Sequence, residues 1–184
     1  DCLNDEILDL LYKYMKPRYH WLEIGLESGH DEVLEKSGRG HSYQDFEDIY
    51  LKAKEKGFRI CVHIILGLPG DTEEMMLATI KKLVDLKIDG IKLHNLHIIK
   101  NSVFEDEYNN GKIPLYSLEE YKKLIGKILQ MLPSNIVIHR LTGEAPQDLL
   151  VAPEWSFNKR SALTEIDNYL ESMSIFQGSR PAVL

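Results

Sequence analysis

Apolar and polar positions alternate along this chain with two different periods. A period of two, typical of strands, is found in His20–Ser28, Arg59–Leu66, Gly90–Ile98 and Asn135–Leu141. A helical spacing is found from Asn4 to Met15, Ser42 to Gly57, Asp71 to Leu86, Ser117 to Leu132 and Lys159 to Met173. Strands that alternate with helices of this length predict an α/β fold whose parallel strands are joined by right-handed crossovers.

Three of the expected helices begin with a local hydrogen-bonding signature. Ser42, Asp71 and Ser117 each precede an acidic residue by three positions. This spacing is typical of a capping box, in which the two side chains satisfy free amides of the first helical turn. We therefore expect each of these residues to cap a helix.

The two faces of the predicted strands differ in polarity. One face is apolar, whereas the other carries Glu23, Glu27, His63, Lys92, His94 and His139. An ordinary parallel sheet is buried on both faces and contains unbroken apolar runs. A polar inner face instead fits a curved barrel wall around a polar ligand, because an unpartnered buried polar group is costly. The alternative is a network in which these side chains satisfy one another.

Four strands do not close a barrel, so the predicted sheet keeps open parallel edges. The chain also begins directly at a helix cap. We therefore expect either further strands upstream in a longer protein or an unusual sheet. We also expect the isolated chain to associate with itself through an exposed strand edge.

Composition and charge narrow the class of protein. With 184 residues, 43% hydrophobic and 28% charged, the chain has the composition of one globular domain. Only Cys2 and Cys61 occur, which favours a reducing cytoplasm over a disulfide scaffold. No apolar run reaches the roughly 20 residues of a membrane helix. A formal net charge of −7 disfavours general binding of nucleic-acid phosphates by this chain alone.

Two segments resemble the radical S-adenosylmethionine (SAM) superfamily. The first, Ile24–Gly29 with the following Asp31, Leu34, Gly38, Arg39, Gly40 and His41, is similar to that superfamily's fourth strand and the loop after it. The second, Val62–Glu74, is similar to its fifth strand and adenine-contacting turn. The segments Asp89–His94, His139–Pro146 and Ala152–Trp155 resemble more narrowly the subfamily of YhcC and YtqA, near the group of MiaB and the elongator acetyltransferase.

The resemblance implies a partial, TIM-like (β/α)6 barrel, of which this chain supplies the C-terminal half. Residues 1–146 would form the barrel part, 147–176 a C-terminal helical extension and 177–184 a frayed tail. The implied cofactors are SAM and a [4Fe–4S] cluster. The cluster's Cys-x-x-x-Cys-x-x-Cys ligands belong upstream, because Cys2 and Cys61 cannot replace three closely spaced thiolates.

The activity implied for the complete enzyme is cleavage of SAM to a 5′-deoxyadenosyl radical, with an electron donor such as flavodoxin or ferredoxin. This chain alone would be inactive. Because neighbouring families modify RNA, a wobble uridine of tRNA is the suggested substrate, and a small metabolite stays open. The alternative function is a non-catalytic half-barrel that binds a nucleotide or a protein. Three upstream cysteines at the cluster spacing would favour the enzyme, and their absence would favour the binding module.

Four residues are candidates for SAM binding through their places in the matching motifs. Glu27, at the carboxyl end of its strand, would accept hydrogen bonds from ribose hydroxyls, or else pair with Lys92. Arg39 would bind the methionine carboxylate through its planar fork. His63 stands where relatives have an aspartate that contacts the ribose, and it would make one hydrogen bond there. Gly67 would let the main chain approach the adenine, or serve a turn that needs positive φ.

His94, His139 and Arg140 are candidates for a substrate-facing set. They would bind an anionic or polar substrate group or take part in proton transfer. A structural hydrogen-bond network is the alternative. His94 and His97 are three residues apart, which on a strand places them on opposite faces, so no metal site is expected.

Overall fold

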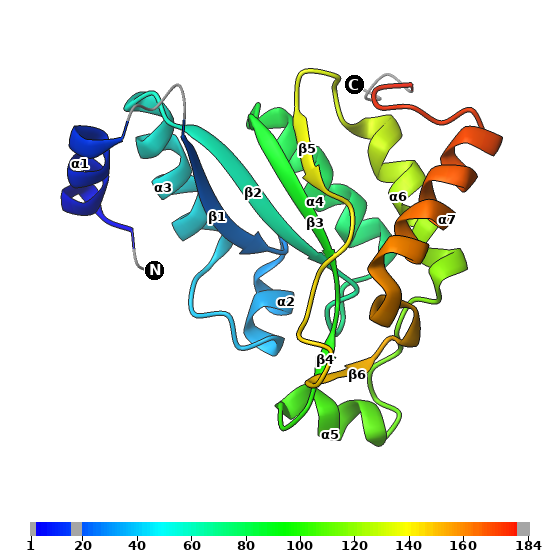
Figure 1. Cartoon of the computed structure of the whole chain (residues 1–184). Helices are drawn as coiled ribbons and strands as arrows, with labels where there is room; N and C mark the ends of the chain where they lie inside the picture. Colours follow the sequence, from blue (N-terminus) through cyan, green and yellow to red (C-terminus); the bar gives the residue numbers. More distant parts are fainter. Residues whose placement is uncertain (1–2, 16–19, 180–184) are drawn as a thin grey trace.

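The computed structural model describes residues 3–15 and 20–179. Its central sheet consists of β1 (Trp21–Glu27), β2 (Arg59–Leu66), β3 (Gly90–Asn95) and β5 (Val137–Arg140), as Figure 1 shows. The strands lie in the order β1-β2-β3-β5, and every neighbouring pair is parallel. The predicted α/β class with parallel strands is confirmed. β1 and β5 form the two edges of this sheet.

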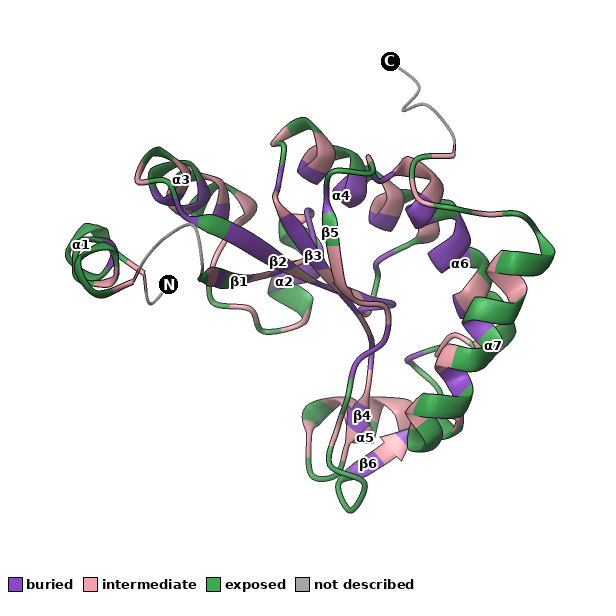
Figure 2. Cartoon of the chain, turned by 45° about the horizontal axis from the view of Figure 1, so that its top comes forward, coloured by how far each residue is buried: buried purple, intermediate pink, exposed green. Residues whose placement is uncertain are grey.

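Helices cover one face of the sheet (Figures 1 and 2). The covering helices are α3 (Tyr43–Glu55), α4 (Glu73–Asp85) and α6 (Leu118–Met131). Further out lie α1 (Asp5–Tyr14) beside α3 and α7 (Lys159–Ser172) beside α6. In the described part of the chain, no helix is both long and apolar enough to cross a membrane.

The local capping signatures are confirmed at two of the three expected places. Ser42 and Ser117 each form a complete capping box with the acidic residue three positions later. The expected cap at Asp71 is wrong, because Thr72 caps α4 with its hydroxyl. Asp71 is instead directed into the interior, where it is only 8% exposed. Burial raises the pKa of its carboxyl to about 6.

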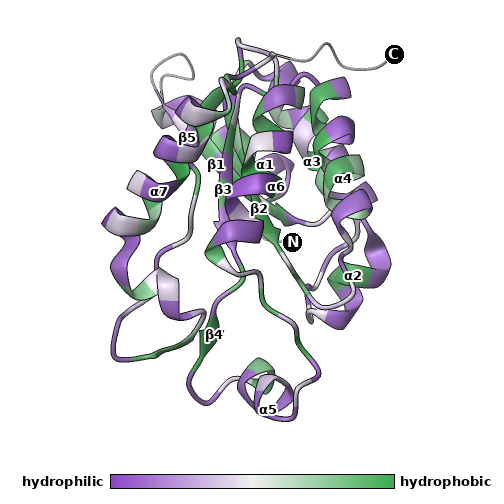
Figure 3. Cartoon of the chain, turned by 90° about the vertical axis from the view of Figure 1, so that its right-hand side faces the viewer, coloured by the Kyte–Doolittle hydropathy of each residue, from purple (hydrophilic) through white to green (hydrophobic). Residues whose placement is uncertain are grey.

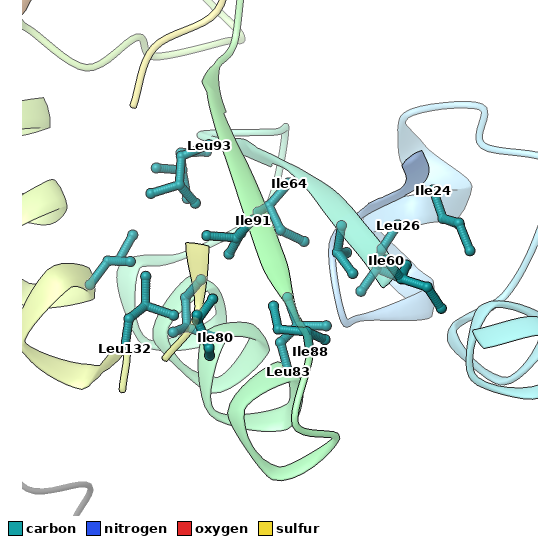
Figure 4. Packing of buried hydrophobic residues seen from close by; sticks show 14 of the residues in the cluster. Ile24, Leu26, Ile60, Ile64, Ile80, Leu83, Ile88, Ile91, Leu93 and Leu132 are labelled. Atoms are coloured by element: carbon teal, nitrogen blue, oxygen red, sulfur yellow. The ribbon is translucent and has the colours of Figure 1, made fainter. Parts of the chain in front are cut away.

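The apolar faces of the strands pack against the helices in one continuous core. Figure 4 shows sheet residues of this core, among them Ile24, Leu26, Ile60, Ile64, Ile91 and Leu93. Ile80 and Leu83 of α4 meet them from the helical layer. Full burial of one such side chain contributes about 1.5–3 kcal/mol. This one-sided core holds the sheet in place and leaves its polar face available for a site.

A small second unit lies beyond the carboxyl ends of the strands (Figures 1 and 3). It contains α5 (Val103–Asn109) and the antiparallel pair β4 (Ile98–Ile99) and β6 (Leu150–Ala152). The strand predicted as Gly90–Ile98 is therefore too long. The chain leaves the sheet after Asn95, and Ile98 pairs with Ala152 instead. The sequence patterns also did not predict the short helices α2 (Asp31–Lys36) and η1 (Glu154–Asn158).

The first residues of the expected frayed tail are held against the domain. The Gln177 side chain donates hydrogen bonds to the carbonyl oxygens of Pro133 and Ile136, both at 2.7 Å. The amide of Gly178 donates to the carbonyl of Leu129. Gln177 and Gly178 are therefore tied to the domain by hydrogen bonds, and residues 180–184 lie outside the described residues.

Candidate ligand site at the carboxyl ends of the strands

A cavity of about 450 Å³ opens at the carboxyl ends of β1, β2 and β3. Polar and aromatic side chains in its lining include Glu27, Arg39, His63, His94, His97 and Phe104. Three of the four predicted SAM-binding residues therefore meet in one cavity. Gly67 lines a neighbouring cavity of about 420 Å³, and Leu68 borders both.

Glu27 ends β1 in a strained backbone conformation. Its φ is 73°, in the left-handed region that is unfavourable for a residue other than glycine. The pairing register with β2 shifts at this position. Burial raises the pKa of Glu27, and the charge of Arg39 offsets part of that rise. The structure thus maintains an unfavourable backbone to place a carboxyl group at the cavity.

Arg39 is fixed beside Glu27 by contacts with the edge of β1. Its Nη2 donates a hydrogen bond to the carbonyl of Gly25 at 2.9 Å, and its Nε donates to His41 Nε2 at 2.7 Å. Nη2 lies 4.0 Å from the Glu27 carboxylate, and the side chain is 35% exposed. The guanidinium is therefore oriented and still accessible to an anionic group.

Glu23, His63 and Lys92 form a polar layer across three adjacent strands. The Glu23 Oε2 atom accepts from Lys92 Nζ at 2.5 Å and lies 2.9 Å from His63 Nε2. The expected alternative pairing of Lys92 with Glu27 is not formed. The hydrogen bond from Lys92 lowers the pKa of Glu23. Burial, followed by the charge of Lys92, lowers the pKa of His63.

His94 and His97 line the same cavity, contrary to the expected opposite orientation. The expectation assumed one continuous strand, whereas β3 ends at Asn95 between them. The Nε2 atoms of both rings are buried without a hydrogen-bond partner among the described residues. Burial, with His63 next in effect, lowers the pKa of His94 to about 4. Burial also lowers the pKa of His97, so both rings are neutral near pH 7.

His139 and Arg140 lie on β5, away from the cavity lining. The His139 ring packs edge-on against Trp21, with centroids 4.3 Å apart, and its Nε2 is buried without a hydrogen-bond partner among the described residues. Arg140 lies opposite Lys92 in the register between β5 and β3. The charge of Arg140 helps to lower the pKa values of His63 and His94. Of the expected substrate-facing set, His94 lines the cavity, and His139 and Arg140 are not among its lining residues.

Two contributors to the site did not emerge from the motifs. Phe104 reaches the cavity from α5. Asn95 ends β3, accepts a hydrogen bond from the Gly143 amide at 3.0 Å and donates to Ser156 at 2.9 Å. A signal for Asn95 was present, because an amide side chain at the carboxyl end of a parallel strand is at a functional position.

Gly67 has a backbone conformation that suits glycine. Its φ is 89°, and a Cβ atom there would lie 3.2 Å from the ring of Tyr116. Both observations fit the turn explanation, in which a side chain is excluded by strain and by its neighbour. They are also compatible with close approach of the main chain to a ligand.

The described residues do not fit a [4Fe–4S] cluster. Cys61 is a single thiol buried in the core, and burial raises its pKa to about 12. Cys2 lies outside the described residues. Within residues 3–15 and 20–179, no group of three or more His, Cys, Asp or Glu side chains could hold a metal ion. The cavity does fit SAM in its chemistry, because residues with a guanidinium, a carboxyl group and imidazole rings line it.

The chain is thus a parallel α/β protein with a cavity lined by polar side chains at the carboxyl ends of its strands. The family model of the radical SAM superfamily matches residues 1–83, and that of the Radical_SAM C-terminal domain matches residues 88–172. The chain belongs to the radical SAM superfamily. The two matched regions share one sheet, because β2 pairs with β3 across their boundary.

Curated relatives place the chain in the subfamily of YhcC and YtqA. Protein YhcC of Escherichia coli K12 is 36% identical over 180 residues, which is 97% of this chain and 58% of YhcC. The uncharacterized protein YtqA of Bacillus subtilis is 35% identical over 178 residues, 97% of this chain and 55% of YtqA. The chain thus spans little more than half the length of these relatives.

A solved structure confirms the fold. Elp3 of the archaeon Methanocaldococcus infernus matches with a TM-score of 0.80 and 21% sequence identity. The match covers 95% of this chain and 40% of that chain. The predicted partial barrel of the radical SAM type is therefore confirmed as the fold of this chain.

Proposed function

We propose that this chain supplies the SAM-binding and substrate-facing half of a radical SAM enzyme. The observation that carries the proposal is the cavity in which Glu27, Arg39 and His63 meet. Its volume of about 450 Å³ lies within the range of small-molecule sites. In the complete enzyme, SAM and a [4Fe–4S] cluster held by upstream cysteines would supply a 5′-deoxyadenosyl radical that takes a hydrogen atom from the substrate.

In this proposal the chain's own residues bind and orient SAM. Arg39, already oriented by Gly25 and His41, binds the methionine carboxylate. Glu27 accepts hydrogen bonds from ribose hydroxyls, and the charge of Arg39 favours its ionised form. Residues 1–146 form the barrel part, and residues 147–176 extend it by α7, which packs on α6.

The test is formation of 5′-deoxyadenosine by the complete protein. The protein is reconstituted anaerobically with iron and sulfide, then given SAM and a strong reductant. We expect 5′-deoxyadenosine in chromatography with mass detection, and less of it with Glu27→Gln. The matched control is Glu165→Gln on the exposed side of α7, which should behave as wild type. Failure to form any cluster would favour a non-catalytic binding module instead.

For the substrate we propose a tRNA wobble uridine. The resemblance to RNA-modifying neighbours supports this, whereas the net charge of −7 requires that phosphate-binding surface come from the rest of the complete protein. We expect the complete protein to retain tRNA on filters at low salt, with affinity falling as salt rises. No retention at low salt would overturn the RNA substrate and leave a small metabolite.

The remaining partners follow from the same proposal. Reduction of the cluster requires an electron donor such as flavodoxin or ferredoxin, and the cytoplasm is the proposed location. The edges β1 and β5 are open in the four-stranded sheet. An isolated chain would associate through one of them, whereas the complete protein would cover the β1 edge with further strands.

A further inference from the structure

His63 contacts Glu23, which in turn accepts a hydrogen bond from Lys92. A single hydrogen bond from His63 to a ribose would not need these two partners. We infer that His63, oriented by Glu23, is a proton acceptor for the substrate in the cavity. The substrate group placed against it is accordingly a hydrogen-bond donor, an O–H or N–H group rather than a carboxylate or phosphate oxygen. The reaction that we assign to His63 rests on the proposed function. The geometry of the His63 ring rests on contacts between described residues.

The contact with Glu23 determines which ring nitrogen of His63 carries the hydrogen. His63 Nε2 lies 2.9 Å from Glu23 Oε2. An ionised carboxylate only accepts hydrogen bonds, and Lys92 at 2.5 Å from the same oxygen keeps Glu23 ionised. Nε2 must therefore carry the hydrogen and donate it. In the neutral ring Nδ1 then has a free lone pair, on a residue that lines the cavity.

The surroundings of His63 keep its ring neutral. The charged and titratable groups whose effect on His63 is resolved are Glu23 on β1, Lys92 on β3 and Arg140 on β5. The His94 ring lies beside it, and Glu27, Arg39 and His97 line the same cavity. Burial and the two cations lower the pKa of His63, and Glu23 opposes them. The net shift is downward, so His63 is neutral near pH 7 and ready to accept a proton.

The proposed reaction is a proton transfer from the substrate to the His63 ring. The X–H bond of the substrate breaks, the proton moves to His63 Nδ1, and the electron pair remains on X. The resulting imidazolium keeps its Nε2–H bond to Glu23, whose negative charge stabilises it. Release of the proton to water restores the neutral ring. Glu23 and Lys92 are positioning residues, and the His94 ring lies beside His63, 5.4 Å away by centroids.

The test follows the His63 ring in the complete protein labelled with ¹⁵N-histidine, by long-range ¹H–¹⁵N spectra recorded across pH. We expect hydrogen on Nε2 and a titration midpoint below the ordinary value of 6.5. Glu23→Gln should lower the midpoint by about one pH unit, and Lys92→Met should raise it by about as much, since opposite charges shift pKa in opposite directions. The Glu165→Gln control should leave it unchanged. These opposed shifts establish which charges act on the ring, and hydrogen on Nε2 establishes Nδ1 as the accepting atom.

Two results would overturn the inference. One is hydrogen on Nδ1, or a midpoint that neither Glu23→Gln nor Lys92→Met moves. The other is loss of the free Nδ1 signal when SAM is added to protein carrying its cluster in the oxidised, diamagnetic form, which would assign His63 to the ribose. Neither measurement requires radical formation. Absence of 5′-deoxyadenosine would therefore reject the proposed function while leaving the ring geometry to be judged from the spectra.

Discussion

Replacement of Tyr121 by alanine is expected to lower the free energy of unfolding of this chain by about 3–5 kcal/mol, the usual cost of removing a buried aromatic ring. Tyr121 is completely buried on α6. Its ring lies 5.1 Å from that of Trp155 by centroids, and its hydroxyl donates a hydrogen bond to the carbonyl of Leu141 at 2.7 Å. The substitution leaves a cavity where α6 meets the segment after β5. Urea denaturation followed by circular dichroism measures the loss.

Tyr121→Phe is the matched control, because it keeps the ring and removes only the hydrogen bond to Leu141. We expect it to cost about 0.5–1.5 kcal/mol. Equal losses for the two variants would show that the hydrogen bond, rather than ring packing, holds α6 at this place. A changed denaturant slope would instead indicate an altered unfolded or native state, and the two free energies could then not be compared.

Elements with a local chemical signal could be predicted from the sequence. The capping boxes at Ser42 and Ser117 need only two side chains within one turn, and both form as expected. The strand Arg59–Leu66 was predicted with its observed bounds, because Gly57 and Gly67, both at positive φ, interrupt the chain on either side. In these places the residues nearby determine the backbone without help from distant contacts.

Errors occurred where distant contacts decide the structure. Alternation continues past Asn95, but the chain turns away because Ile98 pairs with Ala152, which lies more than fifty residues later. The helix α5 did have a local signal, since Ser102 caps it by accepting a hydrogen bond from the amide of Glu105. The helix is only 7 residues long, which is too short for an apolar period to become visible.

The candidate site was predictable in its outline and not in its pairings. Carboxyl ends of adjacent parallel strands meet at one edge of a sheet, which is sufficient to bring Glu27 near His63. Which carboxylate Lys92 would contact depends on register. Gly25, aligned with His63 and Lys92, is two residues from both Glu23 and Glu27. The register shift between Gly25 and Glu27 breaks this symmetry, and Lys92 bonds to Glu23.

Arg39→Ala is expected to weaken SAM binding to the complete protein by about 1.5–3 kcal/mol, the usual contribution of a hydrogen bond to a charged group. That corresponds to a rise in Kd of about 10- to 150-fold. A second effect acts in the same direction. Because the charge of Arg39 holds down the pKa of Glu27, its removal raises that pKa further and leaves less carboxylate to accept from the ribose. Equilibrium dialysis with labelled SAM on the reconstituted protein measures the change.

Two further variants separate direct binding from an effect on the sheet. Arg39→Lys keeps the positive charge and loses the planar fork, so it should recover only part of the affinity. Arg59→Ala removes an arginine from the opposite end of β2, where its guanidinium lies 4.3 Å from the Trp21 ring centroid, and should bind SAM as wild type does. Equal losses in Arg39→Ala and Arg59→Ala would point to a distorted sheet. Unchanged SAM affinity in Arg39→Ala would show that Arg39 does not bind SAM and that another cation binds the methionine carboxylate.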